Sequence, residues 1–539
     1  MPRLLLLVAK VLRGLAGAGL VVVGALLLSA GWANSRSYAP AVARWAPDSA
    51  TVQVAAGPEY ARGAGWQWLW GAHHRAVWAT PITAPVLRLA TGRRDSLLPL
   101  RAGGSYQSRT LRLRVASGHQ FVLRSVDKDA RAALPAGWVR RLLGGLMRDQ
   151  TSAALPYGAY VAARLADAAG VFHTNPRLVY LPDDPGLGKF RAGYANALYL
   201  LEERAEGDQR RAPGFGRSPA VVSTARLLAE LRRRPAAQAD ARAYLRARLL
   251  DLLLGDWSRR EDQWRWASFP RPGSGPAFRP IPRDRDQAFF AFDDGFFPWL
   301  IAGFVPKYQS FHAGFGPGSV AGLGITARAL DRTLLAPLGA DDFRREADSL
   351  GRRLSDAALA AALAAGPPET RAALAARLGP ALRARRAQLP AVARQYFRLL
   401  AAEAWVVGTD APERFVLRAA AGGGLRVRVL ARRPTGPDSL VSARTYRPAS
   451  TRRVELYGLG GDDVFEVRGP LPAGVAVHLY GGNGRNQVRT EATGLATVTW
   501  HGTNPGPARL PPGISSVPDP HPELTANGLA WLRRYNLRD

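Results

Sequence analysis

Apolar and polar residues alternate in the first third of the chain, which predicts β-strands there. The segments TLRLRV (110–115) and QFVLRSV (120–126) alternate on either side of the turn ASGH. A period of two places one set of side chains on each face of a strand, so these segments predict a hairpin. Trp66, Trp68 and Trp70 also alternate, and we interpret them as one face of a strand packed into the core.

Apolar residues three and four positions apart predict helices over residues 135–170, 220–254 and 340–404. In the second stretch, Leu245, Leu249 and Leu252 belong to one apolar stripe with arginines opposite, and Gly255 ends the helix. The sequences GPPE and LPAV should interrupt the third stretch. Alternating strands with glycine turns return from about residue 412.

The order of these patterns predicts an α+β protein. A β-rich N-lobe followed by an α-helical C-lobe is the outline of a two-lobed protein-kinase-like region, and a small all-β domain follows it. The expected segments are a signal peptide or N-terminal membrane anchor (1–33), a β/aromatic segment (34–84), the N-lobe (85–205), the C-lobe (206–405), a β sandwich or short β-helix (406–500) and a loose tail (501–539).

The N-terminus has the pattern of an export segment. Arg3, Lys10 and Arg13 precede the apolar run GLAGAGLVVVGALLLSAGWA (14–33), and Gly31-Trp32-Ala33 is a small-x-small triplet. Either cleavage after Ala33 or an uncleaved anchor fits this pattern. We expect an exported protein, in the periplasm or associated with the outer membrane, that contacts the membrane through this segment.

Composition narrows the possible functions. The net charge is +31, but the chain has only four lysines, and its arginines are dispersed rather than clustered. We therefore expect no nucleic-acid partner, because phosphate-backbone binding calls for a basic patch. The chain has no cysteine, which excludes disulfides, thiolate metal sites and a cysteine nucleophile.

Several residues of the first lobe have the types that phosphate binding requires. Gly103 and Gly104 lie between two strands, where they either approach a ligand or form a tight turn. Lys128 follows the hairpin and is a candidate for phosphate contact, although it could also be a surface lysine. Asp149 on the next helix would orient Lys128, and we add Glu202, at the end of the strand ALYLLEER, to the nucleotide-binding set.

The second lobe supplies candidate catalytic and metal residues. The stretch GDWSRREDQW follows the helix that ends at Gly255, and it contains Asp256, Ser258 and Gln263. Asp284 and Asp286 come later, in RDRDQ, and on a strand they would share one face and hold Mg²⁺ or Mn²⁺ with ATP. Both loops could equally be solvated turns paired with arginines.

The stretches LRSVDKD, GDWSRREDQWRW and IPRDRDQAF, with RDQTSAALPYGAYVAARLADAAGVFHTNPRLVYLPDD, resemble a group of bacterial envelope proteins over about Gly57 to Gly482. In that group a kinase-like region often precedes an outer-membrane barrel of the BamA surface-antigen type, and the kinase-like part is distantly similar to HipA-type and CotH-type kinases. The resemblance implies an outer-membrane barrel protein as a partner. No run of barrel strands follows the β domain here, so we expect no barrel within this chain.

One departure from the group bears on catalysis. The group's loop usually reads Asp-Arg-His after GDW, whereas this chain reads Ser258-Arg259-Arg260. At neutral pH a serine without a base of its own cannot accept the proton of the phosphate acceptor, as the missing aspartate would. Asp256 is the one acid nearby that could replace it. The resemblance therefore implies a degenerate kinase-like site, a pseudokinase that binds nucleotide and metal but transfers phosphate weakly or not at all.

The C-terminal region contains an imperfect repeat, VELYGLGGDDVFEV and VHLYGGNGRNQV. Its glycine turns resemble calcium-binding nonapeptide turns, which makes Asp462 and Asp463 a candidate calcium site. Glycine turns without a metal are the alternative.

Three functions remain open at this stage. The first is a degenerate nucleotide and metal site, for which Lys128, Asp284 and Asp286 should meet in one cleft beneath Gly103 and Gly104. The second is a non-catalytic envelope scaffold associated with outer-membrane proteins, in which these residues lie apart or are neutralised by arginines. The third is calcium-dependent adhesion through the β domain.

Overall fold

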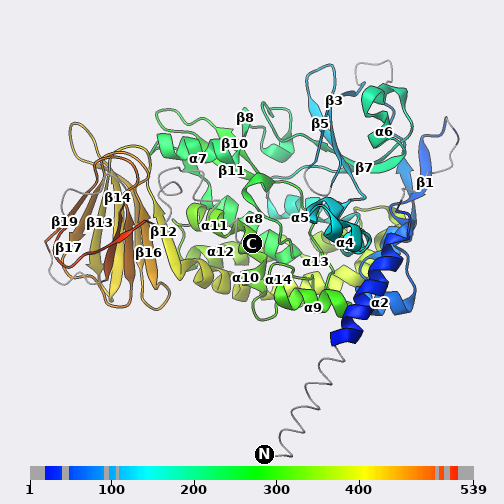
Figure 1. Ribbon diagram of the computed structural model, residues 1–539. Helices are drawn as coiled ribbons and strands as arrows, with labels where there is room; N and C mark the ends of the chain where they lie inside the picture. Colours follow the sequence, from blue (N-terminus) through cyan, green and yellow to red (C-terminus); the bar gives the residue numbers. More distant parts are fainter. Residues whose placement is uncertain are drawn as a thin grey trace, which may run out of the picture.

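The computed structural model describes residues 19–38, 46, 48–89, 96–104, 108–491, 497–502 and 510–519. Within these ranges the protein is a mixed α+β structure with several separate sheets, which confirms the predicted class. Figure 1 shows a β domain at one end, helices in the middle, and a second group of strands with an N-terminal helix at the other end. The predicted tail, residues 501–539, lies mostly outside the described residues.

The segment before the first large sheet is a two-stranded antiparallel sheet with short helices between its strands. Its elements are β1 (Thr51–Ala55), α2 (Ala64–Trp70), α3 (Arg75–Ala79) and β2 (Pro81–Pro85). The strand predicted from the three alternating tryptophans is wrong, since they lie on α2. Trp66 and Trp70 are one helical turn apart and their rings stack at 6.0 Å, whereas Trp68 faces outward. Five residues are too few to separate a period of two from a period of 3.6.

The largest N-terminal sheet has five strands in the order β3-β4-β5-β7-β6. Its elements and the helices beside them are β3 (Leu98–Gly103), β4 (Thr110–Arg114), β5 (Gln120–Ser125), α4 (Trp138–Asp149), α5 (Gly158–Ala169), β6 (Arg177–Leu181), α6 (Arg191–Tyr194) and β7 (Ala197–Glu203). The predicted hairpin is β4–β5, with Leu111 opposite Leu123 in a buried core. The face that carries Arg124 turns the other way, because alternate residues of a strand face opposite sides.

The middle of the chain combines helices with a four-stranded sheet in the order β8-β10-β11-β9. Its elements are β8 (Ala220–Ser223), α7 (Thr224–Arg233), β9 (Gln238–Ala239), α8 (Ala241–Leu254), β10 (Trp264–Phe269), β11 (Ala277–Pro282), α9 (Phe296–Phe304), α10 (Ser319–Leu323), α11 (Arg328–Leu334), α12 (Ala340–Arg353), α13 (Asp356–Leu363) and α14 (Arg371–Ala401). The sequence patterns did not reveal this small sheet inside the helical region.

Helix α14 runs without a break through Pro380 and Pro390, so the interruption predicted at LPAV is wrong. A proline inside a helix removes one hydrogen bond and bends the axis, and packing on both sides offsets that cost. Leu389 and Val392 on either side of Pro390 are buried in the main core. The predicted break at GPPE is present, because α13 ends at Leu363 and α14 begins at Arg371.

Helix α8 is the central element of this region and leads into the candidate loop. Its leucines are fully buried, and it ends at Gly255, whose φ is +68°. Arg385 of α14 donates hydrogen bonds to the carbonyl oxygens of Leu252 (2.6 Å) and Leu253 (2.8 Å). The last carbonyls of a helix lack partners within the helix, so this guanidinium satisfies them and fixes where the loop begins.

The C-terminal domain consists of two five-stranded sheets, β12-β16-β18-β20-β21 and β15-β14-β13-β17-β19. The strands are β12 (Glu403–Val407), β13 (Glu413–Ala420), β14 (Gly424–Ala431), β15 (Ser439–Tyr446), β16 (Arg453–Tyr457), β17 (Val464–Arg468), β18 (Ala476–Tyr480), β19 (Gln487–Thr490), β20 (Val498–Gly502) and β21 (Ser515–Pro518). From β16 to β20 the chain alternates between the two sheets, and like strands pair in parallel. The imperfect repeat thus corresponds to successive coils of a short β-helix, β16–β17 and β18–β19.

An apolar helix, residues 19–34, lies against α2, α4 and α9. No helix within the described ranges is both long and apolar enough to cross a membrane. The end of this helix is joined to α4 by Asn34, whose side chain bonds the carbonyl oxygens of Arg141 (2.9 Å) and Leu142 (2.7 Å) and accepts from the Gly145 N–H (2.8 Å). A Cβ on Gly145 would lie 2.5 Å from the backbone carbon of Ala33. The two backbones meet because residue 145 is glycine.

Two adjacent glycines of α4 allow a matched test of this joint. Gly145→Ala should destabilise the protein by about 1–3 kcal/mol, because the added Cβ meets backbone that cannot rotate away. Gly144→Ala should stabilise it by up to about 1 kcal/mol, because its Cβ meets only the Arg131 side chain at 3.5 Å. Thermal unfolding measures both, and trypsin cleavage after Arg36 should accelerate in Gly145→Ala alone. Equal behaviour of the two variants would contradict the close joint.

Candidate functional site

The candidate site forms where the end of β5 meets the loop after β11. Lys128 follows β5, and its Nζ lies 2.6 Å from Oδ2 of Asp286 in the loop. Both side chains are nearly buried, with 10% and 12% exposure. An ammonium that follows β5 and a carboxylate from the loop after β11 are therefore in direct contact, as the first hypothesis requires.

A second ion pair lies beside the first. Arg124, on the face of β5 opposite to that of Leu123, places Nη1 3.0 Å from Oδ2 of Asp284. Burial alone would lower the pKa of Arg124, but the carboxylates of Asp284 and Glu202 raise it. Burial raises the pKa of Glu202 to about 7, against the opposing effect of Arg124. The structure thus gathers Glu202, Asp284 and Asp286 around two cations, and sequence patterns did not reveal Arg124.

The two aspartates lie in a loop and not on a strand, so that part of the prediction is wrong. Strand β11 ends at Pro282, and Asp284 has a left-handed backbone with φ of +54°. The carbonyl oxygens of Arg283 and Asp284 accept hydrogen bonds from Arg259, at 2.8 and 2.6 Å. Aspartate tolerates this conformation better than most residues, and Arg259 holds it. The loop turns both carboxyl groups toward the same cations.

The two carboxyl groups also interact with each other. Burial opposes the ionisation of Asp284, but Arg124 holds its pKa below the usual range. Burial and the Asp284 carboxylate raise the pKa of Asp286. Oδ1 of Asp284 is buried without a hydrogen-bond donor. Two adjacent carboxyl groups disfavour each other's ionisation, and their oxygen atoms are ligands of the kind that a hard divalent ion takes.

The remaining metal candidate, Gln263, lies next to this loop. It ends a 3-10 helix (Glu261–Gln263), and its carbonyl oxygen accepts from the Arg283 N–H at 2.9 Å. In the part of the chain that the structure describes, no three His, Asp or Glu side chains form a metal-binding group. A metal at Asp284 and Asp286 would therefore need further oxygen ligands, such as phosphate oxygens, an amide or water.

The loop after α8 contains the two predicted catalytic residues. Asp256 is fully buried, its Oδ2 lies 2.8 Å from Nη2 of Arg259, and its Oδ1 accepts from the Ser258 N–H at 3.1 Å. Burial raises the pKa of Asp256 to about 6, and Arg259 opposes that rise. Ser258 is half-buried. Asp256 is thus engaged within the loop, which argues against its use as a substitute for the missing acid.

Gly103 and Gly104 lie at the same end of the sheet as Lys128. Gly103 is opposite Thr110, and Thr110 is opposite Arg124, four residues before Lys128. Gly104 has a φ of +121°, and a Cβ there would lie 2.0 Å from the carbonyl oxygen of Ser108. The glycine is therefore required by the turn itself, whatever the loop binds.

The predicted pairing of Asp149 with Lys128 is wrong. Asp149 accepts two hydrogen bonds from Arg75, at 3.1 and 2.6 Å, and one from Trp66 Nε1 at 3.0 Å. Arg62 lies 2.9 Å from its Oδ1. These partners come from α2, α3 and the chain before them, and they saturate the carboxylate at the C-terminal end of α4. Asp149 joins the N-terminal segment to α4 and does not orient Lys128.

A buried ion network supports the loop of the two aspartates. Arg285 lies between them in sequence and donates to Oδ1 of Asp251 on α8 at 3.0 Å. Asp251 also pairs with Arg248 at 3.1 Å, and Arg248 with Asp331 of α11 at 2.9 Å. Except for Arg285, these side chains are completely buried. Sequence analysis did not find this network, because nothing separates these arginines from the many others.

The β domain places Asp463 in a column of stacked turns. Oδ1 of Asp463 accepts from the Glu413 N–H at 2.8 Å, and the Asp463 N–H donates to Oδ1 of Asn486 at 3.2 Å. Burial raises the pKa of Asp463 to about 9 and that of Glu413 to about 7. Asp462 is exposed and accepts from the Arg485 N–H at 2.8 Å. Calcium at Asp462 and Asp463 stays a prediction.

No protein-family model matches the chain, and no curated protein matches it. One solved structure with a similar course of the chain is a Helicobacter pylori proinflammatory kinase, CtkA. It shares 11% sequence identity, covers 58% of this chain and 97% of its own, and gives a TM-score of 0.30. The predicted relation to HipA-type and CotH-type kinases and to BamA-type barrels stays a prediction.

Proposed function

We propose that the chain binds a nucleotide with Mg²⁺ or Mn²⁺ at Lys128, Asp284 and Asp286 and transfers phosphate poorly or not at all. The 2.6 Å contact between Lys128 and Asp286 carries this proposal. It brings together the two residue types that nucleotide phosphates and their metal require. A bound metal would neutralise the phosphate charge between the two carboxylates, while Lys128 would turn from Asp286 toward the phosphates.

The loop after α8 supports weak transfer. Position 258 is a serine, and the nearest acid, Asp256, is buried against Arg259. A general base must reach the proton that it accepts, and a carboxylate held by a buried guanidinium does not. Gln263 and Glu202 complete the nucleotide and metal set by position, since both lie beside the two aspartates.

Thermal unfolding with ATP and Mn²⁺ tests binding. The wild-type chain should unfold about 2–3 °C higher in their presence, because a ligand at a hundred times its Kd stabilises by about 2.7 kcal/mol. Lys128→Ala should lose this increase. Lys189→Ala is the matched control, because Lys189 is an exposed lysine beside Phe190. A wild-type chain that does not respond, or a response that persists in Lys128→Ala, would contradict the proposal.

Position 258 allows a separate test of transfer. Ser258→Asp restores an acid where the resembling proteins have one, and it should increase phosphate transfer from labelled ATP at least tenfold over wild type. The double variant Ser258→Asp/Asp284→Ala should return to background. Transfer by wild type that Ser258→Asp leaves unchanged would show that residue 258 is not the limiting position.

A non-catalytic scaffold is the second candidate, and the Arg124–Asp284 ion pair favours it. In a purely structural charge cluster, a guanidinium such as that of Arg124 would neutralise the Asp284 carboxylate and leave no place for a metal ion. In that case Arg124→Ala would destabilise the protein without improving its response to Mn²⁺. If the site is a metal site, Arg124→Ala should instead strengthen Mn²⁺ binding, since it removes the competing cation.

We also propose that the chain is exported and keeps residues 19–34 as an uncleaved anchor. Ala30 and Ala33 are fully buried against α4 and its neighbours, and removal of the helix would expose that surface. The intact mass of the protein purified from membranes should therefore include these residues. A mature N-terminus at Asn34 would contradict this proposal.

A further inference from the structure

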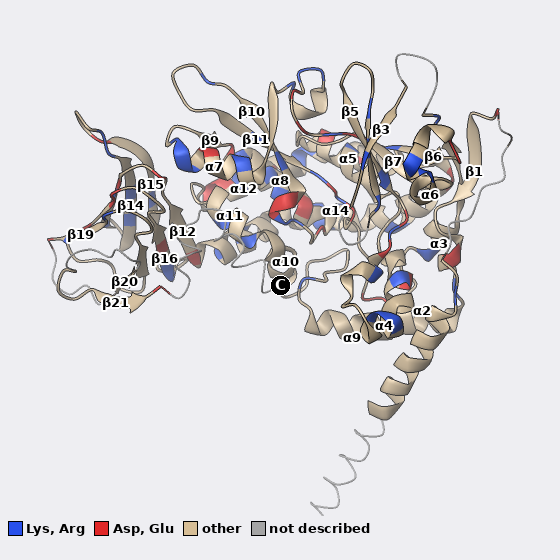
Figure 2. Ribbon diagram, turned by 45° about the horizontal axis from the view of Figure 1, so that its top comes forward, with Lys and Arg blue, Asp and Glu red and all other residues tan. Residues whose placement is uncertain are grey.

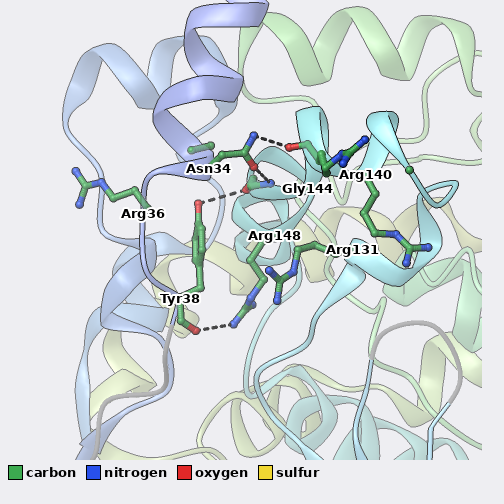
Figure 3. Close-up of a pocket in the computed structure, with 11 residues that line it drawn as sticks. Asn34, Arg36, Tyr38, Arg131, Arg140, Gly144 and Arg148 are labelled. Atoms are coloured by element: carbon green, nitrogen blue, oxygen red, sulfur yellow. Dashed lines mark hydrogen bonds between the residues drawn. The ribbon is translucent and has the colours of Figure 1, made fainter.

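A pocket of about 690 Å³ opens between the end of the N-terminal helix and α4. Figure 3 shows its lining, with Asn34, Arg36 and Tyr38 from one side and Arg131, Arg140, Gly144 and Arg148 from the other. The volume lies in the range of small-molecule binding sites. The two glycines of α4 keep one wall free of side chains.

The lining contains five arginines and no acidic residue. Arg131 pairs with Asp129, and Arg148 pairs with Asp127. Arg140 donates to the carbonyl oxygens of Leu134 and Ala132. Arg131 and Arg148 thus have acidic partners, unlike the other three arginines of the lining.

Three arginines of the pocket have no acidic partner within the residues that the structure describes: Arg36, Arg140 and Arg141. Arg36 stacks over the Trp32 ring at 4.3 Å. Arginines of one sign around a concave surface raise the local concentration of anions, and a guanidinium binds phosphate through two parallel hydrogen bonds. The pocket is therefore suited to a phosphate group.

Apolar helices adjoin the pocket on one side. Helix 19–34 and α9 contain no charged residue, as Figure 2 shows in tan. Their inner faces pack with α2 and α4 in one cluster. Large apolar side chains of helix 19–34, α2, α4 and α9 remain exposed: Trp68, Trp138, Trp299, Leu300, Ile301, Phe304, Leu20, Val21, Leu27 and Leu28.

Exposed tryptophans around an apolar surface are typical of the membrane–water interface, where the ring meets both environments. Trp138 and Trp299 are 69% and 61% exposed. Basic residues next to such a surface attract anionic headgroups. We propose that the pocket binds the phosphate headgroup of an anionic phospholipid while α9 and the tryptophans lie in the interface of the same bilayer. This proposal does not depend on the nucleotide site.

Short-chain lipids test the headgroup site directly. The full chain in a neutral detergent is titrated with dioctanoyl phosphatidylglycerol and with dioctanoyl phosphatidylcholine. Phosphatidylglycerol should bind at least tenfold more tightly. The double variant Arg140→Gln/Arg141→Gln should weaken its binding about thirtyfold, since each arginine near a bilayer contributes about 1 kcal/mol.

A second double variant controls for net charge. Arg418 and Arg426 face each other on β13 and β14, are exposed, and lie in the β domain. Arg418→Gln/Arg426→Gln makes the same change in charge and should leave lipid binding unchanged. Equal loss in both double variants would overturn the site, as would equal affinity for the two lipids. If the Arg140/Arg141 variant does not fold, Arg36→Gln, an exposed position, takes its place and should weaken binding about fivefold.

Two further measurements separate the lipid from other occupants. Inorganic phosphate that binds as tightly as the lipid would assign the pocket to a free anion and overturn the proposal. In vesicles with brominated acyl chains, tryptophan fluorescence of the reconstituted full chain should be quenched, and Trp138→Phe and Trp299→Phe should each reduce the quenched fraction. No reduction in either variant would place this face away from the bilayer, as expected if another protein covers it.

Discussion

Asp251→Ala is expected to lower the free energy of unfolding by about 3–5 kcal/mol, because it leaves buried guanidinium charge without its carboxylate. Asp251 is completely buried between Arg248 and Arg285. For a chain of this length this corresponds to a melting temperature about 3–5 °C lower. The thermal response to ATP and Mn²⁺ should disappear as well, since Arg285 holds the loop that carries Asp284 and Asp286.

An exposed ion pair provides the matched control for this prediction. Asp262 pairs with Arg260, and their side chains are 55% and 41% exposed. Asp262→Ala should change stability by less than about 1 kcal/mol and leave the nucleotide response intact. Asp251→Asn keeps an oxygen for Arg285, so its effect should be intermediate. A melting temperature that falls equally in Asp251→Ala and Asp262→Ala would contradict the role of the buried network.

Asp463→Asn is expected to stabilise the β domain, and the gain should grow with pH. The folded-state pKa of Asp463 is about 9, well above the ordinary value of 3.8. Between these values the folded state binds more protons than the unfolded state, so stability falls as pH rises. Glu413, with a folded pKa of about 7, adds to the loss between its ordinary value of 4.5 and 7.

An amide at position 463 does not ionise, and the equivalent turn already has one, Asn486. At pH 8 the gain should be several kcal/mol, and at pH 4 close to zero. Asp462→Asn, at the exposed neighbouring position, should leave most of the pH dependence in place, because burial is the main cause of the raised pKa of Asp463. Unfolding curves from pH 4 to 9, recorded with a calcium chelator, measure all three proteins. A wild-type β domain that becomes more stable above pH 7 would contradict the buried acid pair.

Local patterns predicted most of the large elements. Alternation identified β4 and β5, and the leucine stripe with Gly255 identified α8 and its end. These patterns gave the wrong secondary structure where they were short or where tertiary packing determined the conformation. The tryptophans of α2 gave a period of two over five residues, and α14 continues through Pro390 because both of its faces are packed.

The sequence predicted several residues of the candidate site, but it did not predict which charged side chains contact each other. Lys128 contacts Asp286, and Asp284 pairs with Arg124 beside them, so the residue types that phosphate chemistry requires identified members of one charge cluster. The partner of each charge was not predictable. The chain has 73 basic residues against 42 acidic ones, so each carboxylate has several possible arginines, and only the folded chain brings Arg124 to Asp284 and Arg75 to Asp149.

The joint between Asn34 and α4 has a consequence for the far end of the molecule. Since Gly145 brings the two backbones into contact, the first helix has no room to swivel, and the β domain lies at the opposite end of the chain of helices (Figure 1). A surface that binds the first helix would therefore also set the distance between that surface and the β domain. The central helices hold this distance constant, and an inserted helical turn would lengthen it by about 5 Å.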